Sequence, residues 1–477
     1  MNPLPSPWQG DVLPMNYSRL NCISFHCSDV SVGVPTFIIV GKLLSHKTNF
    51  SLNEYKYQQF CDTIHNMKRK KVLFLVAVGI IILITVFVIL NRSNADITPN
   101  PQLSDRIGVF GLVNPEMAED LRVGWTRYPI VWTEWEEFRN SGTLTPKIRA
   151  LDRFRQRNPG VKIIITLDSN HPTKTKCFMD DPVFRQQHNI TDKLYATFRP
   201  KANCPPKNLS EYKEYVRDIV TVGKDFVTAW QIGNEVFATP RWDTVFYNGP
   251  FDDPNEIDYL DEFNAAYTTI KEIDPNAVIV SPGINFHRSE FDNLLNHIQL
   301  SDPDEQEKWN NIAINFSKLI INNCNKIDMV DIHLYHTIAS IPNRVKWTSK
   351  VLNESNCNKP IISTEIAGPN PIPGSTEFEN YILNDSQFQA DQANDLQTRI
   401  TLALNNGIQA TLWFYSQDLK TAQEIIDNYN DPEYSSASNI LLSKFGLVEK
   451  DGDFKPAYYK LQTLASQGIG STCKVFE

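Results

Sequence analysis

Apolar and polar positions form separate blocks along the chain after about residue 105. Short apolar runs are divided by longer amphipathic stretches, and runs that are apolar rather than alternating are typical of parallel strands covered on both faces. Eight such runs are present, at residues 107–113, 123–131, 161–167, 226–232, 277–284, 329–334, 360–366 and 410–415.

Helical periodicity fills the gaps between these runs. The predicted helices cover residues 116–121, 134–157, 210–224, 259–273, 306–323, 342–352, 387–406 and 456–465. Eight repeats of strand then helix over residues 105–470 predict an α/β fold, the (β/α)₈ TIM barrel. A doubly wound open sheet is the alternative. No Gly-x-Gly-x-x-Gly or Walker-type loop follows any run, which counts against nucleotide binding.

A different apolar segment, residues 72–90, follows the basic cluster 68–71. At about 1.5 Å per residue it is long enough for the roughly 30 Å hydrocarbon layer of a bilayer. The positive charges on its N-terminal side predict a single-pass type II signal anchor over residues 67–91, with the C-terminal part outside the cytosol. Residues 1–66 are then a cytosolic tail without periodicity, and residues 92–104 are a spacer.

Secretion is the alternative to anchoring. A chain translated from Met67 would begin with a charged region and an apolar region, and the small residues Ser93 and Ala95 would suit a signal peptidase. Both interpretations place residues 105–470 outside the cytosol.

The cysteines and glycosylation motifs agree with that compartment. Cys324 and Cys357 each lie about four residues before a predicted strand, in near-repeats of Asn-Cys-Asn-Lys. Equal offsets on neighbouring parallel strands would bring the sulfurs together, so a disulfide is predicted. Cys177 and Cys204 bracket one long loop as a second candidate pair, and Cys473 is left over. Candidate N-glycosylation sites follow the apolar segment at Asn189, Asn208, Asn315, Asn353 and Asn384.

Composition and charge narrow the classes of partner. The 477 residues are 41% hydrophobic, enough for a large core, and the net charge is −9. The predicted globular part has no basic cluster to replace the counterions of a nucleic acid, so nucleic-acid binding is not expected.

Two predicted strands end in a glutamate. The fourth run continues through Asn234 to Glu235, and the seventh ends Ser-Thr-Glu at Glu365. The carboxyl ends of barrel strands open onto one face, where catalytic groups of such barrels lie. Cleavage of a glycosidic bond needs two carboxyl groups, one to protonate the leaving oxygen and one to attack or to activate water. The pair therefore predicts glycoside hydrolysis.

An Asn-Glu at the end of strand four and a Glu at the end of strand seven resemble clan A glycoside hydrolases, which are retaining (β/α)₈ enzymes. The resemblance covers residues 105–470. It implies that Glu235 is the acid/base, that Glu365 is the nucleophile, and that Asn234 binds the 2-hydroxyl of the sugar. Families 39 and 5 are the most similar types, and no motif separates them.

Further residues match the same clan. Arg127 on strand two resembles the arginine that pairs with the nucleophile, and residues 331–335 on strand six resemble its His-x-Tyr segment. The resemblance implies that His333 lies near the nucleophile and that Tyr335 donates a hydrogen bond to Glu365. Trp413, at the end of strand eight, matches an aromatic residue that stacks under the sugar.

The sequence thus predicts a membrane-anchored glycosidase that cleaves a β-linked glycoside or polysaccharide by double displacement. A catalytically inactive carbohydrate-binding or adhesion protein with the same barrel is one alternative, and a transglycosylase is another. No cofactor is expected, because neither a metal-ligand spacing nor a serine-hydrolase elbow is present. The sugar, the linkage, endo or exo action and the oligomeric state stay open.

Overall fold

A computed structural model of the chain describes residues 104–139, 146–171, 173–175, 182–187, 205–236, 259–285, 313, 316–335, 337–371, 375–429 and 441–467. The chain divides into two compact units, Met1–Ile97 and Thr98–Glu477, and every described residue belongs to the second. The predicted tail and anchor therefore lie outside the described residues. Within the described ranges, no helix has the length and apolar character needed to cross a membrane.

The second unit is built on one parallel sheet, with a strand for each of the eight predicted runs. These strands are β1 (Ser104–Phe110), β2 (Val123–Val131), β3 (Lys162–Asp168), β4 (Ala229–Ile232), β5 (Val278–Val280) with β6 (Ile284–Asn285), β7 (Val330–His333), β8 (Ile361–Ile366) and β9 (Thr411–Trp413). The predicted eight-stranded parallel barrel is confirmed.

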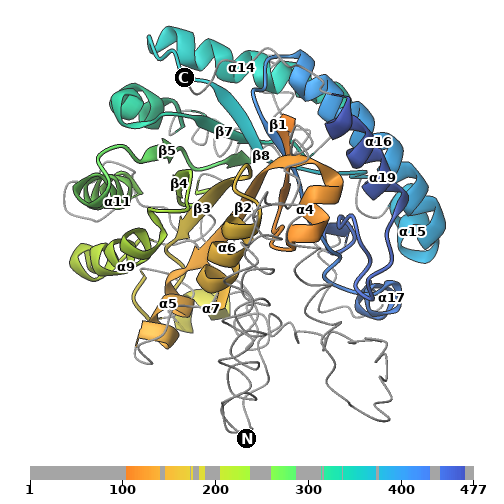
Figure 1. The fold of residues 1–477 in the computed structure, drawn as a ribbon, viewed down its shortest axis with the longest axis horizontal. Helices are drawn as coiled ribbons and strands as arrows, with labels where there is room; N and C mark the ends of the chain where they lie inside the picture. Colours follow the sequence, from red (N-terminus) through yellow and green to blue (C-terminus); the bar gives the residue numbers. More distant parts are fainter. Residues whose placement is uncertain are drawn as a thin grey trace, which may run out of the picture. The chain divides into compact units, whose positions relative to one another are not determined.

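The strands follow one another around the barrel in the order β5-β4-β3-β2-β1-β9-β8-β7-β6. The fifth barrel strand is in two pieces, because residues 281–283 separate β5 from β6. β6 pairs with β7, and Val280 of β5 forms a parallel bridge with Met329 next to β7, so the ring is nearly closed. Figure 1 shows the strands at the centre with the helices around them.

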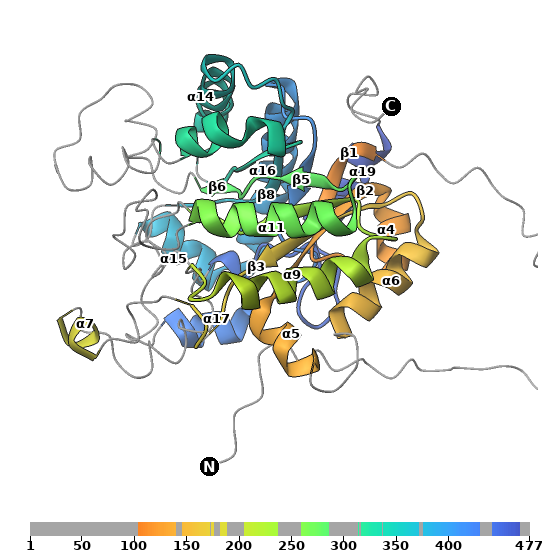
Figure 2. The same ribbon diagram turned by 90° about the vertical axis from the view of Figure 1, so that its left-hand side faces the viewer.

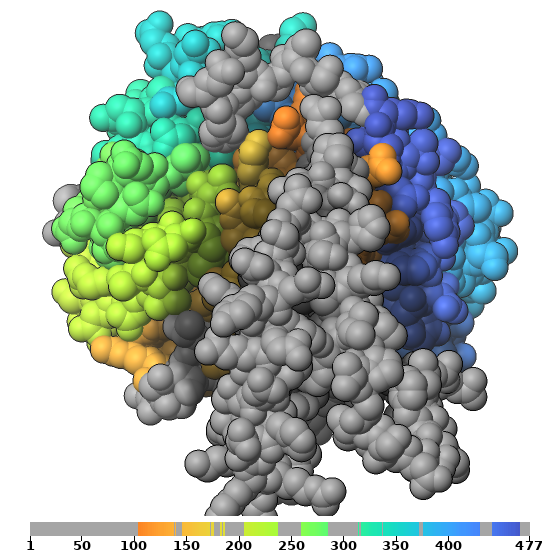
Figure 3. All heavy atoms as spheres, viewed as in Figure 1, coloured from red at the N-terminus to blue at the C-terminus, as the bar shows by residue number. Residues whose placement is uncertain are grey.

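Most of the helices form the outer layer of the barrel. Those with defined bounds are α4 (Pro115–Leu121), α5 (Trp132–Arg139), α6 (Pro146–Arg157), α7 (Pro182–Gln187), α9 (Leu209–Gly223), α11 (Tyr259–Ile273), α14 (Ile341–Glu354), α15 (Thr376–Leu383), α16 (Asp385–Asn405), α17 (Ala422–Tyr429) and α19 (Pro456–Ser466). Of these, α7 stands apart from the strands (Figure 2). Residues 316–323 are also helical. Figure 2 shows α9 and α11 side by side on this layer, and Figure 3 shows the described residues following one another in chain order around the first strands.

The expected single helix over residues 134–157 is wrong. The structure has two helices there, α5 and α6, and residues 140–145 between them lie outside the described residues. Pro146 begins α6, which suits a residue without a backbone N–H, because the first turn of a helix has no acceptor for that group.

An apolar plug fills the interior of the barrel and is separate from the larger core between strands and helices. Its members all come from the strands or the residues next to them: Trp125, Ile164, Ala229, Val280, Met329, Ile362, Ala410 and Leu412. The barrel interior is thus a packed core rather than a pore.

The predicted disulfide between Cys324 and Cys357 is confirmed, with the two Cα atoms 5.7 Å apart. The strands that follow these cysteines are paired, with Val330 opposite Ile361. The expected equal offsets are wrong, because Cys324 lies six residues before Val330 and Cys357 lies four residues before Ile361. Cys177, Cys204 and Cys473 lie outside the described residues.

Three of the five candidate glycosylation sites are described, and all three are exposed: Asn208, Asn353 and Asn384. Asn208 and Asn384 are helix N-caps whose side-chain oxygens accept from backbone N–H groups, at 2.8 and 3.1 Å. Asn189 and Asn315 lie outside the described residues. Glycosylation stays a prediction.

Candidate active site

A layer of polar side chains crosses the barrel directly above the apolar plug. Its members lie two residues beyond plug residues on five strands, as expected for side chains that alternate between the two faces of a strand. They are Arg127, Thr166, Gln231, Asp331 and Thr364, and none is more than 1% exposed.

Hydrogen bonds join this polar layer into one chain. Arg127 Nε donates to Thr166 Oγ1 at 2.8 Å, and Thr166 Oγ1 donates to Gln231 Oε1 at 2.8 Å. Gln231 Nε2 donates to Asp331 Oδ2 at 2.6 Å, and the Thr364 hydroxyl donates to the same oxygen at 2.6 Å. The layer is therefore a fixed base for the residues at the strand ends.

A turn in left-handed backbone places Glu235 beyond the end of β4. Gly233 has a φ of +75° and Glu235 a φ of +51°. A Cβ on Gly233 would come within 2.9 Å of Val236 Cγ1, so glycine is needed for space as well as for φ. A glutamate in this conformation costs about 1 kcal/mol, a strain that is concentrated at functional sites.

A β-bulge aims Glu365. Ser363 pairs with Thr411 and Ile366 pairs with Trp413. Between these two pairs, β8 has one residue more than β9. Simple alternation would put Thr364 and Glu365 on opposite faces of the strand. The extra residue of the bulge allows both side chains to reach partners inside the barrel, which is the usual effect of bulges beside active sites.

Glu365 is 3% exposed and is held by two donors. Arg127 Nη1 forms an ion pair with Glu365 Oε1, and the Tyr335 hydroxyl donates to Glu365 Oε2. Burial and the charge of Glu365 raise the pKa of Tyr335 well above 10, so the phenol stays protonated and acts as a donor. Arg127 Nη2 also donates to Asn234 Oδ1 at 2.6 Å, which ties the residue before Glu235 to the same guanidinium.

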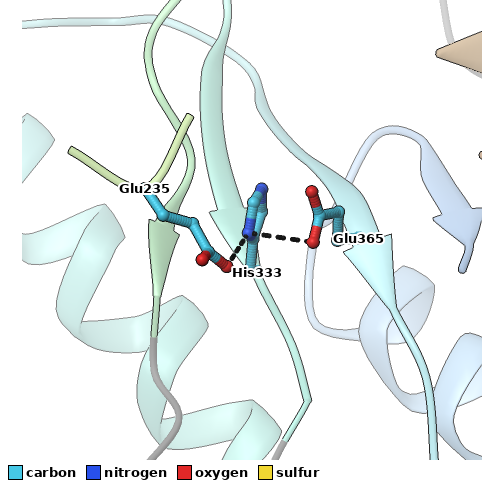
Figure 4. Close-up of side chains that lie close together, drawn as sticks. All are labelled: Glu235, His333 and Glu365. Atoms are coloured by element: carbon cyan, nitrogen blue, oxygen red, sulfur yellow. Dashed lines mark hydrogen bonds and ion pairs between the residues drawn. The ribbon is translucent and has the colours of Figure 1, made fainter. Parts of the chain in front are cut away.

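His333 lies between the two glutamates (Figure 4). Its Nδ1 is 2.6 Å from Glu235 Oε1 and 3.5 Å from Glu365 Oε2, and its Nε2 is 3.2 Å from Asp331 Oδ2. Burial alone would lower the pKa of His333, but the charges of Glu365 and Asp331 and the hydrogen bonds to Asp331 and Glu235 raise it to about 10. At neutral pH the ring is therefore an imidazolium that donates from both nitrogens.

The same three residues have the spacing of a metal site, since one ligand atom from each of Glu235, His333 and Glu365 lies within 4.8 Å of the others. An imidazolium has no lone pair to give to a metal. The guanidinium of Arg127 adds a second positive charge beside Glu365. The arrangement favours proton transfer and charge stabilisation over metal binding.

No family model and no curated protein matches the chain. Solved structures with a similar fold include a family 39 glycoside hydrolase from the gut symbiont Bacteroides cellulosilyticus WH2, at 15% identity and a TM-score of 0.45; the match covers 78% of this chain and 65% of that enzyme. A glucosidase from Croceicoccus marinus matches at 14% identity and a TM-score of 0.46, over 77% of this chain and 68% of the glucosidase. A GH30 endoxylanase from Clostridium papyrosolvens C71 matches at 13% identity and a TM-score of 0.41, over 77% and 72%. Such identities assign no activity, so the function rests on the site.

The structure brings together six of the seven predicted site residues: Glu235, Glu365, Asn234, Arg127, His333 and Tyr335. Trp413 is not among them. Leu412 belongs to the plug inside the barrel, so Trp413 points to the opposite face, where it is 0% exposed and its Nε1 donates to the carbonyl of Phe445 at 2.8 Å. Phe414 packs against Tyr335 instead, with ring centroids 5.6 Å apart.

Thr166, Gln231, Asp331 and Thr364 are site residues that the motifs of the sequence did not predict. One signal could have found them, because each is a polar residue inside a mainly apolar run. A buried polar side chain must find a partner, so four such residues on neighbouring strands indicate a hydrogen-bonded layer.

Proposed function

We propose that this chain is a glycosidase that cleaves the O-glycosidic bond of a β-linked glycoside with retention of configuration. The observation that carries the proposal is the pair of buried carboxylates at the ends of strands four and seven, with one oxygen of each within 4.8 Å of the other. Carboxyl groups about 5 to 5.5 Å apart suit direct attack on the anomeric carbon, whereas inversion needs about 6.5 to 9.5 Å.

The different partners of the two glutamates support separate roles. Arg127 and Tyr335 stabilise Glu365 as an anion, which suits the nucleophile. Glu365 attacks the anomeric carbon while Glu235 gives its proton to the leaving oxygen and the glycosidic bond breaks. In the second step Glu235 takes a proton from water, whose oxygen attacks the anomeric carbon and releases Glu365.

The charges of the buried cluster fit both steps. Two cations, Arg127 and His333, face two anions, Glu365 and Asp331, when Glu235 carries its proton. After attack, Glu365 is a neutral ester and Glu235 has lost its proton. The cluster therefore again has two cations and two anions. Because unbalanced charge is costly in a buried site, this balance favours the proposed sequence of proton transfers.

The test is turnover by the purified full-length protein on a panel of aryl β-glycosides and β-linked polysaccharides. We expect wild-type protein to release the sugar first as the β-anomer, detected by ¹H NMR. Glu365→Ala should lose at least 10⁴-fold in kcat, because it lacks the nucleophile. Equal turnover by both forms would contradict the mechanism. Wild-type binding without turnover would favour the carbohydrate-binding alternative, and transfer to an added sugar would favour a transglycosylase.

We also propose that residues 72–90 anchor the protein in a membrane, with residues 105–470 outside the cytosol. The length of the apolar segment and the basic cluster before it support this topology. Sequencing the N-terminus of the mature protein tests it, since a terminus near Asp96 would mean cleavage and secretion.

A further inference from the structure

Directly below the two glutamates lies a third carboxylate, which neither transfers a proton nor forms a bond in the proposed steps. Asp331 is on β7, two residues before His333, and is 0% exposed. Its Oδ1 accepts from the backbone N–H of Thr364 at 2.8 Å, and its Oδ2 accepts from Gln231 and from the Thr364 hydroxyl, both at 2.6 Å. A buried carboxylate with this many donors is fixed in one position.

Asp331 contacts the surroundings of both catalytic glutamates. On one side its Oδ2 is 3.2 Å from His333 Nε2, and the other ring nitrogen lies 2.6 Å from Glu235. On the other side it holds both the backbone N–H and the hydroxyl of Thr364, the residue immediately before Glu365. One side chain thus fixes groups that position the acid/base and the nucleophile.

The interruption of the fifth strand completes the cradle of the His333 ring. A Cβ on Gly283 would lie 2.0 Å from His333 Nε2, so only glycine leaves room for the imidazole. Ser281, at the same interruption, accepts from the backbone N–H of Asp331 at 2.9 Å. The ring is therefore confined on one face by Gly283 and at one edge by Asp331.

We propose that Asp331 is a positioning residue of this site. It orients His333 so that Nδ1–H points to Glu235. It also fixes Thr364, so that the carboxyl groups of Glu365 and Glu235 keep the separation that direct attack requires. The inference rests on the proposed function. Asp331 is a positioning residue and not a catalytic one, because it touches neither the substrate nor the reacting atoms. A misplacement of about 1 Å at such a site costs about 10²-fold in rate.

The kinetic test compares three variants with wild type. Asp331→Asn keeps the shape of the side chain but removes the charge that holds the imidazolium. Gly283→Ala pushes the ring from the other side while Asp331 stays intact. Both should lower kcat about 10²-fold with KM within about threefold, since positioning affects the reacting groups more than binding. Asp418→Asn is the matched control, because Asp418 is a buried carboxylate ion-paired with Lys455 outside this network; it should lower the melting temperature and leave kcat unchanged.

A second readout does not depend on turnover. Magic-angle-spinning ¹⁵N NMR of the full-length protein labelled at histidine should show one doubly protonated ring at pH 8.5, assigned by its loss in His333→Gln. In Asp331→Asn that signal should become a neutral tautomer at the same pH, a change that general destabilisation does not produce.

The outcomes separate the two proposals. If Asp331→Asn keeps both the kcat and the imidazolium signal of wild type, the positioning role is overturned while the glycosidase assignment stands. If wild type cleaves no glycoside but shows the signal and its loss, the proposed function fails and the orientation of His333 by Asp331 stands. If Asp331→Asn does not fold, Gly283→Ala decides, and a wild-type kcat in that variant overturns the proposal.

Discussion

Single residues distinguish the two glutamates. Glu365 has a guanidinium and a phenol as partners, whereas Glu235 has an imidazolium. The sequence could predict both glutamates, because strand ends can be located from the apolar runs. Arg127 lies inside β2, and only the resemblance to clan A glycoside hydrolases indicated it. It could not predict that His333 bonds to Glu235 more closely than to Glu365, since this depends on the interruption of the fifth strand beside the ring.

Arg127→Lys should be damaging although it keeps the charge. Arg127 contacts Thr166, Glu365 and Asn234 at once, and an ammonium cannot reproduce this fork of donors. Each charge-assisted bond contributes about 1.5–3 kcal/mol, so kcat/KM should fall about 10²-fold. Arg106→Lys is the control, because the described hydrogen bonds of Arg106 go only to backbone carbonyls. These carbonyls precede β9, at the opposite end of the strands from the glutamates. An Arg127→Lys variant whose kcat/KM is within threefold of wild type would contradict the role of the guanidinium donors.

His333 should make stability depend on pH. Its pKa is raised from 6.5 to about 10 in the folded protein, so its stabilising effect is complete below about pH 6.5 and is lost as the pH rises through 10. Urea unfolding of wild type and His333→Gln at several pH values measures this effect. The difference in unfolding free energy should be largest at pH 6 and shrink steadily towards pH 10. A difference that stays constant, or grows with pH, would show that the ring is neutral.

Secondary-structure elements were predicted best where the hydrophobic pattern alone decides them. All eight barrel strands overlap their predicted runs, because parallel strands covered on both faces are apolar throughout. The interruption between β5 and β6 was missed, because the predicted run of residues 277–284 was carried through Ser281, Pro282 and Gly283, although a Pro-Gly pair is a turn signal. The bulge in β8 was missed as well, because a bulge changes the pairing of strands and not their composition.

The Cys324–Cys357 disulfide joins the segment before β7 to the segment before β8. It should stabilise the barrel without affecting catalysis. Its cysteines are 33 residues apart, and closing a loop of this length contributes roughly 3–4 kcal/mol through the entropy of the unfolded chain. The double variant Cys324→Ala/Cys357→Ala should lose about this much unfolding free energy in urea, with kcat unchanged. A loss of kcat at full stability would contradict a purely structural role.

The second candidate disulfide, Cys177 with Cys204, can be tested against the pairing of neighbouring residues. Thr175 and Pro206 form an antiparallel bridge. Cys177 and Cys204 lie outside the described residues, two positions beyond Thr175 and two before Pro206. If the antiparallel pairing continues outward from this bridge, the two cysteines would stand opposite each other. Non-reducing peptide mapping should therefore recover a Cys177–Cys204 peptide. Recovery of free thiols at both positions would contradict the prediction.

At the scale of the whole molecule, the barrel gathers groups that are far apart in the sequence. Arg127 and Glu365 are separated by 238 positions and form a buried ion pair, because the pairing of β1 with β9 leaves only these two strands between β2 and β8 around one interior. Below them the apolar plug keeps the barrel closed, so the cluster opens only at the carboxyl ends of the strands. The predicted anchor would determine the cellular location of the barrel and has no part in the structure of the site.

The central claim is that Glu365 forms a covalent bond to the sugar. The most direct measurement is labelling with a panel of 2,4-dinitrophenyl 2-deoxy-2-fluoro-β-glycosides, which slow hydrolysis of the glycosyl-enzyme, followed by peptide mapping by mass spectrometry. We predict one sugar per chain, on the peptide that contains Glu365, and no label in Glu365→Gln. A label on Glu235 or another residue, or continued turnover of the natural glycoside without any label, would contradict the account.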